Sequence, residues 1–145
     1  MKTITVIFSI LFFSSALAFS QNVGDTLVSN NPAITKVKVF YFHITDRCHT
    51  CYSIETNVRK TLFKNFKNEL DSGIIDLQIL NCEKLENVAL VKKYNAYGST
   101  LALTKIENGA EVKIDDITNF AFSKIHDESV FISELKLKIQ ELLKP

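Results

Sequence analysis

Four segments of the chain have the composition and spacing of β-strands. The most apolar is KVKVFYFHI at residues 36–44, in which β-branched and aromatic side chains occupy both faces of an extended chain. Because both faces are largely apolar, the pattern predicts a central strand that is covered on both sides. Residues 74–82 predict a second strand, and 100–106 and 111–115 predict two shorter ones. The Asn-Gly dipeptide at 108–109 predicts a hairpin turn between the last two, since both residue types tolerate positive φ.

Three other segments have apolar residues three and four positions apart, which predicts helices. The first stripe runs from Cys51 to Leu70, and that helix is expected to stop at Gly73, which readily takes the left-handed conformation. A shorter stripe predicts a helix over residues 86–97. A stripe with a spacing of four over 131–142 predicts a helix near the C-terminus.

The predicted order of elements is β-α-β-α-β-β-α, with residues 117–124 ambiguous. The first β-α-β unit predicts two parallel strands joined by a right-handed crossover, and the hairpin adds an antiparallel pair. We therefore expect an α/β fold in which a four-stranded mixed sheet is flanked by helices. A length of 145 residues suits one such domain, placed at residues 36–145 after an N-terminal leader over 21–35.

Residues 1–20 have a different pattern, typical of a signal peptide. Lys2 is followed by an uncharged, mostly apolar run over residues 4–19, and small residues stand where signal peptidase reads the chain. We expect cleavage after Ser20 and a periplasmic or secreted mature protein. The alternative is a membrane anchor, but the run is somewhat short for a span of about 20 residues and contains three serines.

Charge excludes some classes of function. The chain has 17 Lys and Arg against 16 Asp and Glu, and loss of residues 1–20 removes Lys2 and no acid, which leaves 16 against 16. A neutral chain without a basic face has no electrostatic basis for binding nucleic acid or an anionic membrane. No second apolar run is long enough to span a membrane, so we expect the mature protein to be soluble.

The candidate chemistry lies in the cysteines. Disulfides persist in an exported chain, and three cysteines leave at least one without a partner in the chain. Cys48 and Cys51 are separated by two residues where the first helix is expected to begin, so their sulfur atoms come within bonding reach. The sequence therefore predicts a redox-active pair at a helix N-terminus.

The helix terminus also predicts which thiol reacts. Free backbone N–H groups and the positive end of the helix dipole favour a thiolate at Cys48, and Arg47 and His49 add positive charge. A free thiol titrates near ~8.5, whereas thiols in such sites titrate at roughly 3.5 to 7.5. We therefore expect Cys48 to be the nucleophile of disulfide exchange, Cys51 the resolving thiol, and Arg47 and His49 the residues that tune the pKa.

Two other interpretations of the Cys-x-x-Cys pair stay open: half of a zinc site and an inert structural disulfide. Zinc normally needs four ligands, and His43, Cys82 and His126 can join the pair only through the fold. We expect Cys82 to be a small core residue. Asp76, inside a predicted strand, is either a proton acceptor beneath the pair or a solvated residue.

These residues resemble the thioredoxin-like superfamily over residues 36–143. The order of elements agrees with the minimal fold of that family, and Cys48 and Cys51 fall where it has its nucleophile and its resolving cysteine. More narrowly, FYFHITDRCHTC at 40–51 and DDITNFAF at 115–122 are similar to small exported proteins of the ArsF family, described as nitrophenyl-compound nitroreductase subunits.

The chain departs from the thioredoxin pattern at two places. Arg47 replaces a Trp and His49-Thr50 replaces Gly-Pro, which resembles oxidising members more than strongly reducing ones. Where the family has a cis-proline, this chain has Ser99 and Thr100; a cis bond without proline costs about 2.5–4 kcal/mol, so we expect a trans bond. The resemblance makes Ser99 and Thr100 the substrate loop, with the Thr100 hydroxyl facing the thiolate.

The function that these residues favour is that of an exported thiol–disulfide oxidoreductase without a cofactor. Its expected partners are protein thiols or disulfides, with a membrane electron donor as a further candidate. Two alternatives stay open. One is a soft-metal or metalloid binding module that uses Cys48, Cys51 and His49. The other is a non-catalytic subunit with a thioredoxin fold, in which the disulfide only braces a loop.

Overall fold

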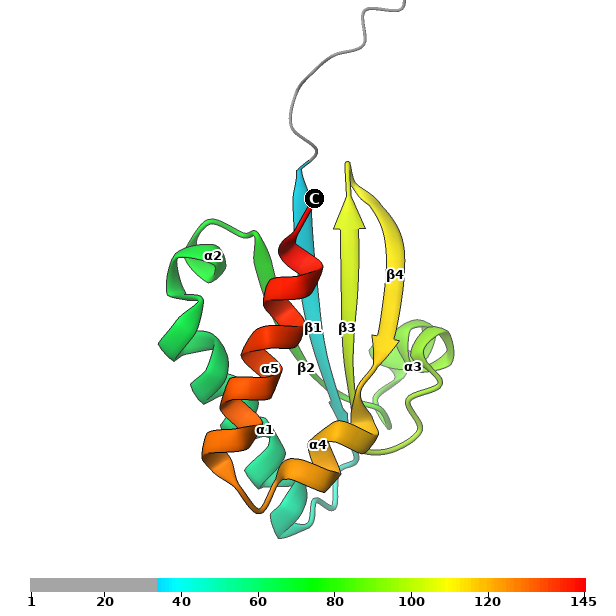
Figure 1. Ribbon diagram of the computed structural model, residues 1–145. Coiled ribbons are helices and arrows are strands. Elements are labelled where there is room, and N and C mark those ends of the chain that lie inside the picture. The colour runs from blue at the N-terminus through cyan, green and yellow to red at the C-terminus, as the bar shows by residue number, and fades with distance from the viewer. Residues whose placement is uncertain (1–33) are drawn as a thin grey trace, which may run out of the picture. The chain divides into compact units, whose positions relative to one another are not determined.

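A four-stranded mixed sheet forms the centre of the structure, a computed structural model that describes residues 34–145. Its strands lie in the order β2-β1-β3-β4 and are β1 (Thr35–His43), β2 (Ile75–Asn81), β3 (Thr100–Glu107) and β4 (Ala110–Asp116). β1 pairs in parallel with β2 and antiparallel with β3, and β3 and β4 form an antiparallel hairpin (Figure 1). All four predicted strands are confirmed. The predicted signal peptide and most of the predicted leader lie outside the described residues.

The turn between β3 and β4 has the conformation that its two residues predict. Asn108 has φ 52° and Gly109 has φ 84°, so both are left-handed. Two successive residues with positive φ match the right-handed twist of the flanking strands. The Asn-Gly dipeptide therefore fixes the position of the hairpin.

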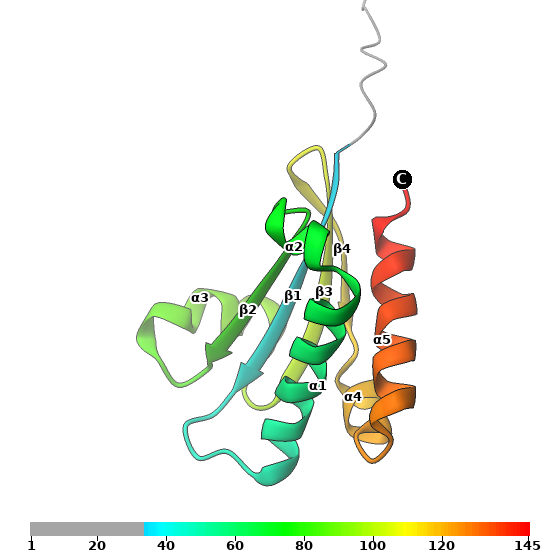
Figure 2. The ribbon, with the colours of Figure 1, turned by 90° about the vertical axis from the view of Figure 1, so that its left-hand side faces the viewer.

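Helices lie on both faces of the sheet. They are α1 (His49–Asn65), α2 (Lys67–Asp71), α3 (Val88–Tyr94), α4 (Thr118–Lys124) and α5 (Glu128–Leu143), with a 3₁₀ turn, η1 (Leu85–Asn87), before α3. Figure 2 shows α1, α4 and α5 on one side of the sheet and α3 on the other. The predicted α/β fold is confirmed, and α4 accounts for the ambiguous segment. Within residues 34–145, no helix has both the length and the hydropathy needed to cross a membrane.

The single helix predicted over residues 51–70 is interrupted at Phe66, so that prediction is wrong in this respect. Phe66 has φ −137° and ψ 30°, and the short helix α2 follows it. Near the end of α1, the Thr61 hydroxyl donates to the Asn57 carbonyl and the Asn65 amide donates to the Thr61 carbonyl. Side chains that bond to helix carbonyls compete with the backbone and bend helices. Apolar spacing does not reveal this effect.

β1 has a core on each of its faces, as its composition predicts. Val37, Val39 and Tyr41 are buried among apolar residues of α1 and α5. Phe40 and Phe42 are buried on the opposite face, in a smaller cluster to which α3 contributes. Over residues 39–42 both faces of the strand are buried, whereas Lys36 and Lys38, near its start, are exposed and half-buried.

Candidate functional site

Cys48 lies at one end of the molecule, where the chain passes from the sheet into its first helix. β1 ends at His43, residues 44–48 form the connection, and α1 begins at His49 (Figure 1). Cys48 is the N-cap residue of α1, with φ −75° and ψ 164°, and it is exposed. Its place at the helix start, next to backbone N–H groups without a helical partner, is the one predicted from the sequence.

Cys51 lies in the first turn of α1 and is only 7% exposed. Both cysteines are free thiols, and their Sγ atoms are 2.8 Å apart. The pair therefore combines an exposed thiol with a buried one that lies within reach of it.

Groups from three neighbouring segments contact Cys51. The Ser99 hydroxyl, next to the start of β3, donates to Cys51 Sγ over 3.0 Å. The Tyr41 hydroxyl of β1 donates to the Cys51 carbonyl over 2.8 Å and lies 3.4 Å from Ser99 Oγ. Arg47, in the connection before α1, donates to the same carbonyl over 3.3 Å. These contacts fix both the backbone and the sulfur of Cys51.

The contacts also decide the acidity of the buried thiol. Burial alone would raise the pKa of Cys51, because a thiolate loses hydration in the interior. Hydrogen bonds from Cys48 and Ser99, together with the positive charge of Arg47, outweigh burial and lower this pKa below its ordinary value. The Cys51 sulfur is thus prepared to carry negative charge although it is buried.

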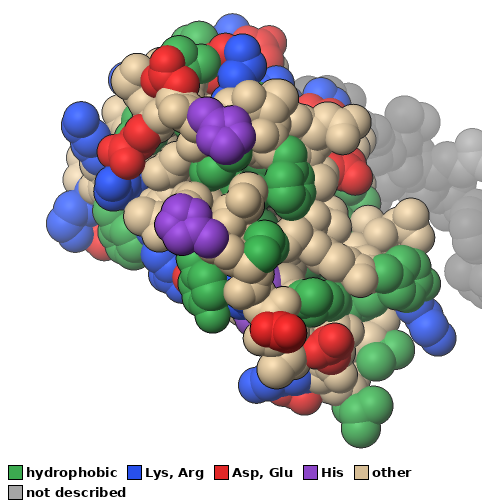
Figure 3. Space-filling model, turned by 90° about the horizontal axis from the view of Figure 1, so that it is seen from below, with side chains coloured by type: hydrophobic (Ala, Val, Ile, Leu, Met, Phe, Trp, Pro, Cys, Tyr) green, Lys and Arg blue, Asp and Glu red, His purple; other side chains and the backbone are tan. Residues whose placement is uncertain are grey.

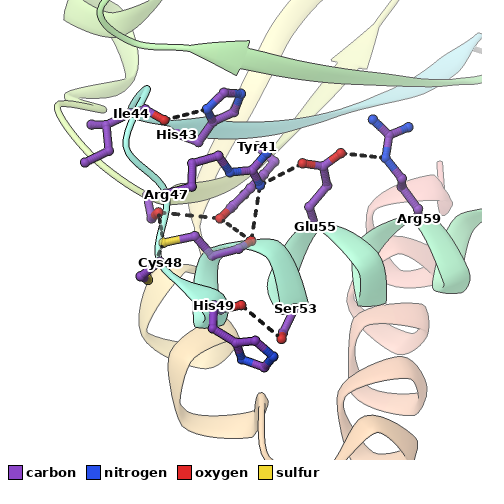
Figure 4. A network of polar contacts seen from close by, with 11 residues as sticks. Tyr41, His43, Ile44, Arg47, Cys48, His49, Ser53, Glu55 and Arg59 are labelled. Carbon is purple, nitrogen blue, oxygen red and sulfur yellow. Dashed lines mark hydrogen bonds and ion pairs between the residues drawn. The ribbon is translucent and has the colours of Figure 1, made fainter.

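Arg47, next to Cys48, forms an ion pair with Glu55 of α1 (Figure 4). Arg47 Nη2 is 2.7 Å from Glu55 Oε2, and the two side chains are only 10% and 16% exposed. The guanidinium carbon of Arg47 lies 4.3 Å from the centre of the Tyr52 ring and 5.6 Å from that of Tyr41. The other oxygen of Glu55 accepts a hydrogen bond of 2.7 Å from Arg59 Nε. Burial would raise the pKa of Glu55, but Arg59 and Arg47 lower it.

Sequence reasoning identified Arg47 in this network and missed Tyr41 and Glu55. Tyr41 lies inside the apolar strand predicted over residues 36–44, and nothing in that pattern indicates that its hydroxyl contacts Cys51. The available signal for Glu55 was its spacing of four from Arg59 on one helix, which is typical of any solvated helix surface. Nothing local indicates that Glu55 turns towards the connection that carries Arg47.

The other residues predicted to belong to the site have different positions. His49 is exposed at the start of α1 and, with Tyr52 and His126, lines a groove with a volume of about 360 Å³. Seen from below, histidine and apolar side chains gather on this end of the molecule (Figure 3). Thr100 pairs with Phe42 in the sheet, and its hydroxyl makes no hydrogen bond to either cysteine among the described residues. The Ser99–Thr100 bond is trans, as expected.

The remaining polar candidates do not join the cysteine pair. Cys82 packs against the core on the α3 side, where burial and the nearby charge of Glu83 raise its pKa. His43 Nδ1 lies 2.8 Å from the Ile44 carbonyl oxygen. Asp76 is exposed and accepts a hydrogen bond from Gln78, so it is solvated rather than placed beneath the pair. In the part of the chain that the structure describes, no three His, Cys, Asp or Glu side chains are grouped as metal ligands.

No protein-family model matches the chain, and no curated protein matches it either. Among solved structures, it is similar to one titled "Structure of a malarial protein", with 19% identity and a TM-score of 0.39 over 64% of this chain and 96% of that one. It is also similar to the germline-specific thioredoxin Deadhead from Drosophila melanogaster, with 16% identity and a TM-score of 0.40 over 63% of this chain and 78% of that one.

The order and pairing of the helices and strands define the fold of the chain. A β-α-β unit with parallel strands is followed by a helix on the opposite face, an antiparallel hairpin and a final helix that packs beside α1. This is the thioredoxin-like fold. Cys48 and Cys51 stand at the start of the helix that follows the central strand. The chain thus has a thioredoxin-like fold with a Cys-x-x-Cys dithiol at the start of α1.

Proposed function

We propose that this protein is a thiol–disulfide oxidoreductase that works outside the cytoplasm. The observation that carries the proposal is the 2.8 Å separation between an exposed sulfur, Cys48 Sγ, and a buried one, Cys51 Sγ. An inert structural pair has no need of an exposed member, nor of a serine hydroxyl directed at the buried sulfur.

The reaction proceeds by two successive exchanges. The Cys48 thiolate attacks one sulfur of a partner disulfide, forms a mixed disulfide and releases the other partner sulfur as a thiolate, which takes up a proton. The Cys51 thiolate then attacks Cys48 Sγ, breaks the mixed disulfide and releases the second partner thiol. The partner gains two electrons and two protons, and Cys48 and Cys51 lose them. The same steps in reverse oxidise a partner dithiol.

Protein thiols or disulfides are the proposed partners. Cys48 lies on an open end of the molecule beside Tyr52, which is 54% exposed, rather than inside an enclosed cavity. A reactive sulfur on an open surface suits a macromolecular substrate. A membrane electron donor remains part of the proposal, as does membership of the narrower ArsF family of small exported proteins.

Export is proposed from the signal-peptide pattern of residues 1–20. It predicts that the mature chain begins at Gln21 and is found outside the cytoplasm. N-terminal sequencing of the protein from fractionated cells tests this directly. A full-length chain that stays in the membrane would favour the anchor instead.

The activity is tested by reduction of a disulfide-bonded protein such as insulin, with dithiothreitol as the electron source. Cys48→Ser should abolish catalysis, and Cys51→Ala should accumulate mixed disulfides that can be isolated from cells. Cys82→Ser is the matched control, since it removes a thiol that lies on the other side of the sheet, and it should keep full activity. A wild-type protein that exchanges no faster than free cysteine, yet takes up one equivalent of arsenite or zinc, would support the binding module.

A further inference from the structure

Arg47 is a charged side chain in an unusual place. It directly precedes the exposed cysteine, is only 10% exposed, and its Nε atom has no hydrogen-bond partner among residues 34–145. Burying an ion pair costs desolvation, and apolar residues of similar volume are often as stabilising or more so. The Arg47–Glu55 pair is therefore poorly explained by stability alone.

One nitrogen of Arg47 contacts both the cysteine helix and the acid. Nη2 lies 3.3 Å from the Cys51 carbonyl oxygen and 2.7 Å from Glu55 Oε2. Arg47 thus brings a positive charge to the first turn of α1, and Glu55 brings a negative charge that partly cancels it. Arg59 holds the far oxygen of Glu55 from the solvent side, with a side chain that is 45% exposed.

We propose that Arg47 and Glu55 are a pair of positioning residues that set the reduction potential of the Cys48–Cys51 couple in opposite senses. Arg47 stabilises the reduced, thiolate-bearing form, and Glu55 limits that stabilisation. The inference rests on the proposed function, because a potential matters only if the couple exchanges electrons. Neither side chain takes part in bond making.

The sign follows from the balance of the reaction. A dithiol donor passes two electrons and two protons to the Cys48–Cys51 disulfide and becomes a disulfide itself, while Cys48 and Cys51 become thiols. One of these thiols then loses its proton to water. A nearby positive charge favours that thiolate and makes the disulfide easier to reduce, and a negative charge has the reverse effect.

The test is the equilibrium of the purified protein with glutathione buffers, which needs no knowledge of the natural partner. Glu55→Gln keeps a hydrogen-bond acceptor for Arg47 but removes its charge. It should raise the equilibrium constant for reduction about tenfold, equivalent to ~30 mV. Arg47→Met should lower the constant by a similar factor, and Arg47→Lys should restore part of the loss.

Two further variants separate charge from structure. The double variant Arg47→Met/Glu55→Gln removes both charges, so its equilibrium constant for reduction should be close to that of the wild-type protein. If the two substitutions acted by disturbing the structure, their effects would add instead. Arg59→Met is the matched control, because it deletes the exposed partner of Glu55 that does not contact Cys51. It should change the constant by less than about twofold, since exposed charges are screened.

The outcomes distinguish the two proposals. If the wild-type protein equilibrates with glutathione but Glu55→Gln and Arg47→Met shift the constant in the same direction, or not at all, the inference is overturned and the proposed function stands. If the wild-type couple forms no disulfide in any glutathione buffer, the proposed function itself fails. If Arg47→Met does not fold, two other variants still test the inference. Glu55→Gln should raise the equilibrium constant for reduction, and Arg47→Lys should lower it slightly.

Discussion

The Ser99 hydroxyl donates a hydrogen bond of 3.0 Å to Cys51 Sγ, although 48 positions of the chain separate the two residues. The bond joins the start of β3 to the first turn of α1 and is directed at the buried sulfur. A hydroxyl donor stabilises a charged acceptor more than a neutral one. The resolving thiol therefore has its own stabilising group, independent of the helix terminus at Cys48.

Removing this hydroxyl should make Cys51 less acidic. We expect Ser99→Ala to raise the Cys51 pKa, because the thiolate then loses a hydrogen-bond donor that stabilises its charge. The pKa can be followed through the carbon-13 shift of the labelled cysteine Cβ in the reduced protein. Thr100→Val is the control and should leave the titration unchanged. Equal shifts in both variants would contradict the assignment to Ser99.

The lowered Cys51 pKa also predicts a pH dependence of stability in the reduced state. A group whose folded pKa lies below its unfolded value contributes stability that is fully present above the unfolded value, ~8.5 for a thiol, and is lost as pH falls through the folded value. The free energy of unfolding of the reduced protein, relative to Cys51→Ala, should therefore rise with pH between those two values. The slope has a limit of about 1.4 kcal/mol per pH unit. Urea unfolding of both proteins in excess reductant measures this difference in unfolding free energy. If the difference stays constant up to about pH 9, the predicted pH dependence is wrong.

A second buried hydrogen bond should contribute to stability without contacting the Cys48–Cys51 pair. Tyr94 and Thr104 are buried on the α3 side of the sheet, with their hydroxyl oxygens 2.6 Å apart. Tyr94→Phe leaves the Thr104 hydroxyl without this partner and should cost about 1–3 kcal/mol of unfolding free energy in denaturant titrations.

Two further variants test whether the loss comes from this hydrogen bond. Adding Thr104→Val to Tyr94→Phe should recover most of the loss, because both polar partners are then replaced by apolar groups. Tyr97→Phe, at a side chain that is 68% exposed, should have almost no effect. A loss in Tyr94→Phe no greater than in Tyr97→Phe would show that the buried bond is unimportant.

The hairpin turn should respond to backbone strain alone. A Cβ atom added at Gly109 would meet no atom within 4 Å, but the residue has φ 84°. Gly109→Ala should therefore destabilise the protein by about 1–2 kcal/mol, the cost of the left-handed region for a residue with a side chain. Asn108→Gly, which relieves the same kind of strain, should not destabilise it. Thermal unfolding of the two variants tests this. If Asn108→Gly lowers the melting temperature as much as Gly109→Ala does, the turn is sensitive to any substitution and backbone strain is not the cause.

Much of the fold could be predicted because its signals are local. The apolar composition of both faces of β1 predicted a central covered strand, and the Asn-Gly dipeptide predicted the hairpin. The position of Cys48 at a helix start followed from the stripe that begins at Cys51. The interruption at Phe66 was missed, because hydrogen bonds from Thr61 and Asn65 to helix carbonyls leave the apolar spacing unchanged.

By itself, the sequence determined where the strands, the hairpin and the cysteine pair lie, because apolar periodicity and backbone preference act between residues a few positions apart. Only the tertiary structure decided that Ser99 bonds to Cys51, that Tyr41 holds its carbonyl, and that Glu55 faces Arg47. These contacts depend on how β1, α1 and the start of β3 pack together. A hydroxyl or a carboxylate has the same identity in the sequence whether it faces water or a buried sulfur, and packing alone selects between the two.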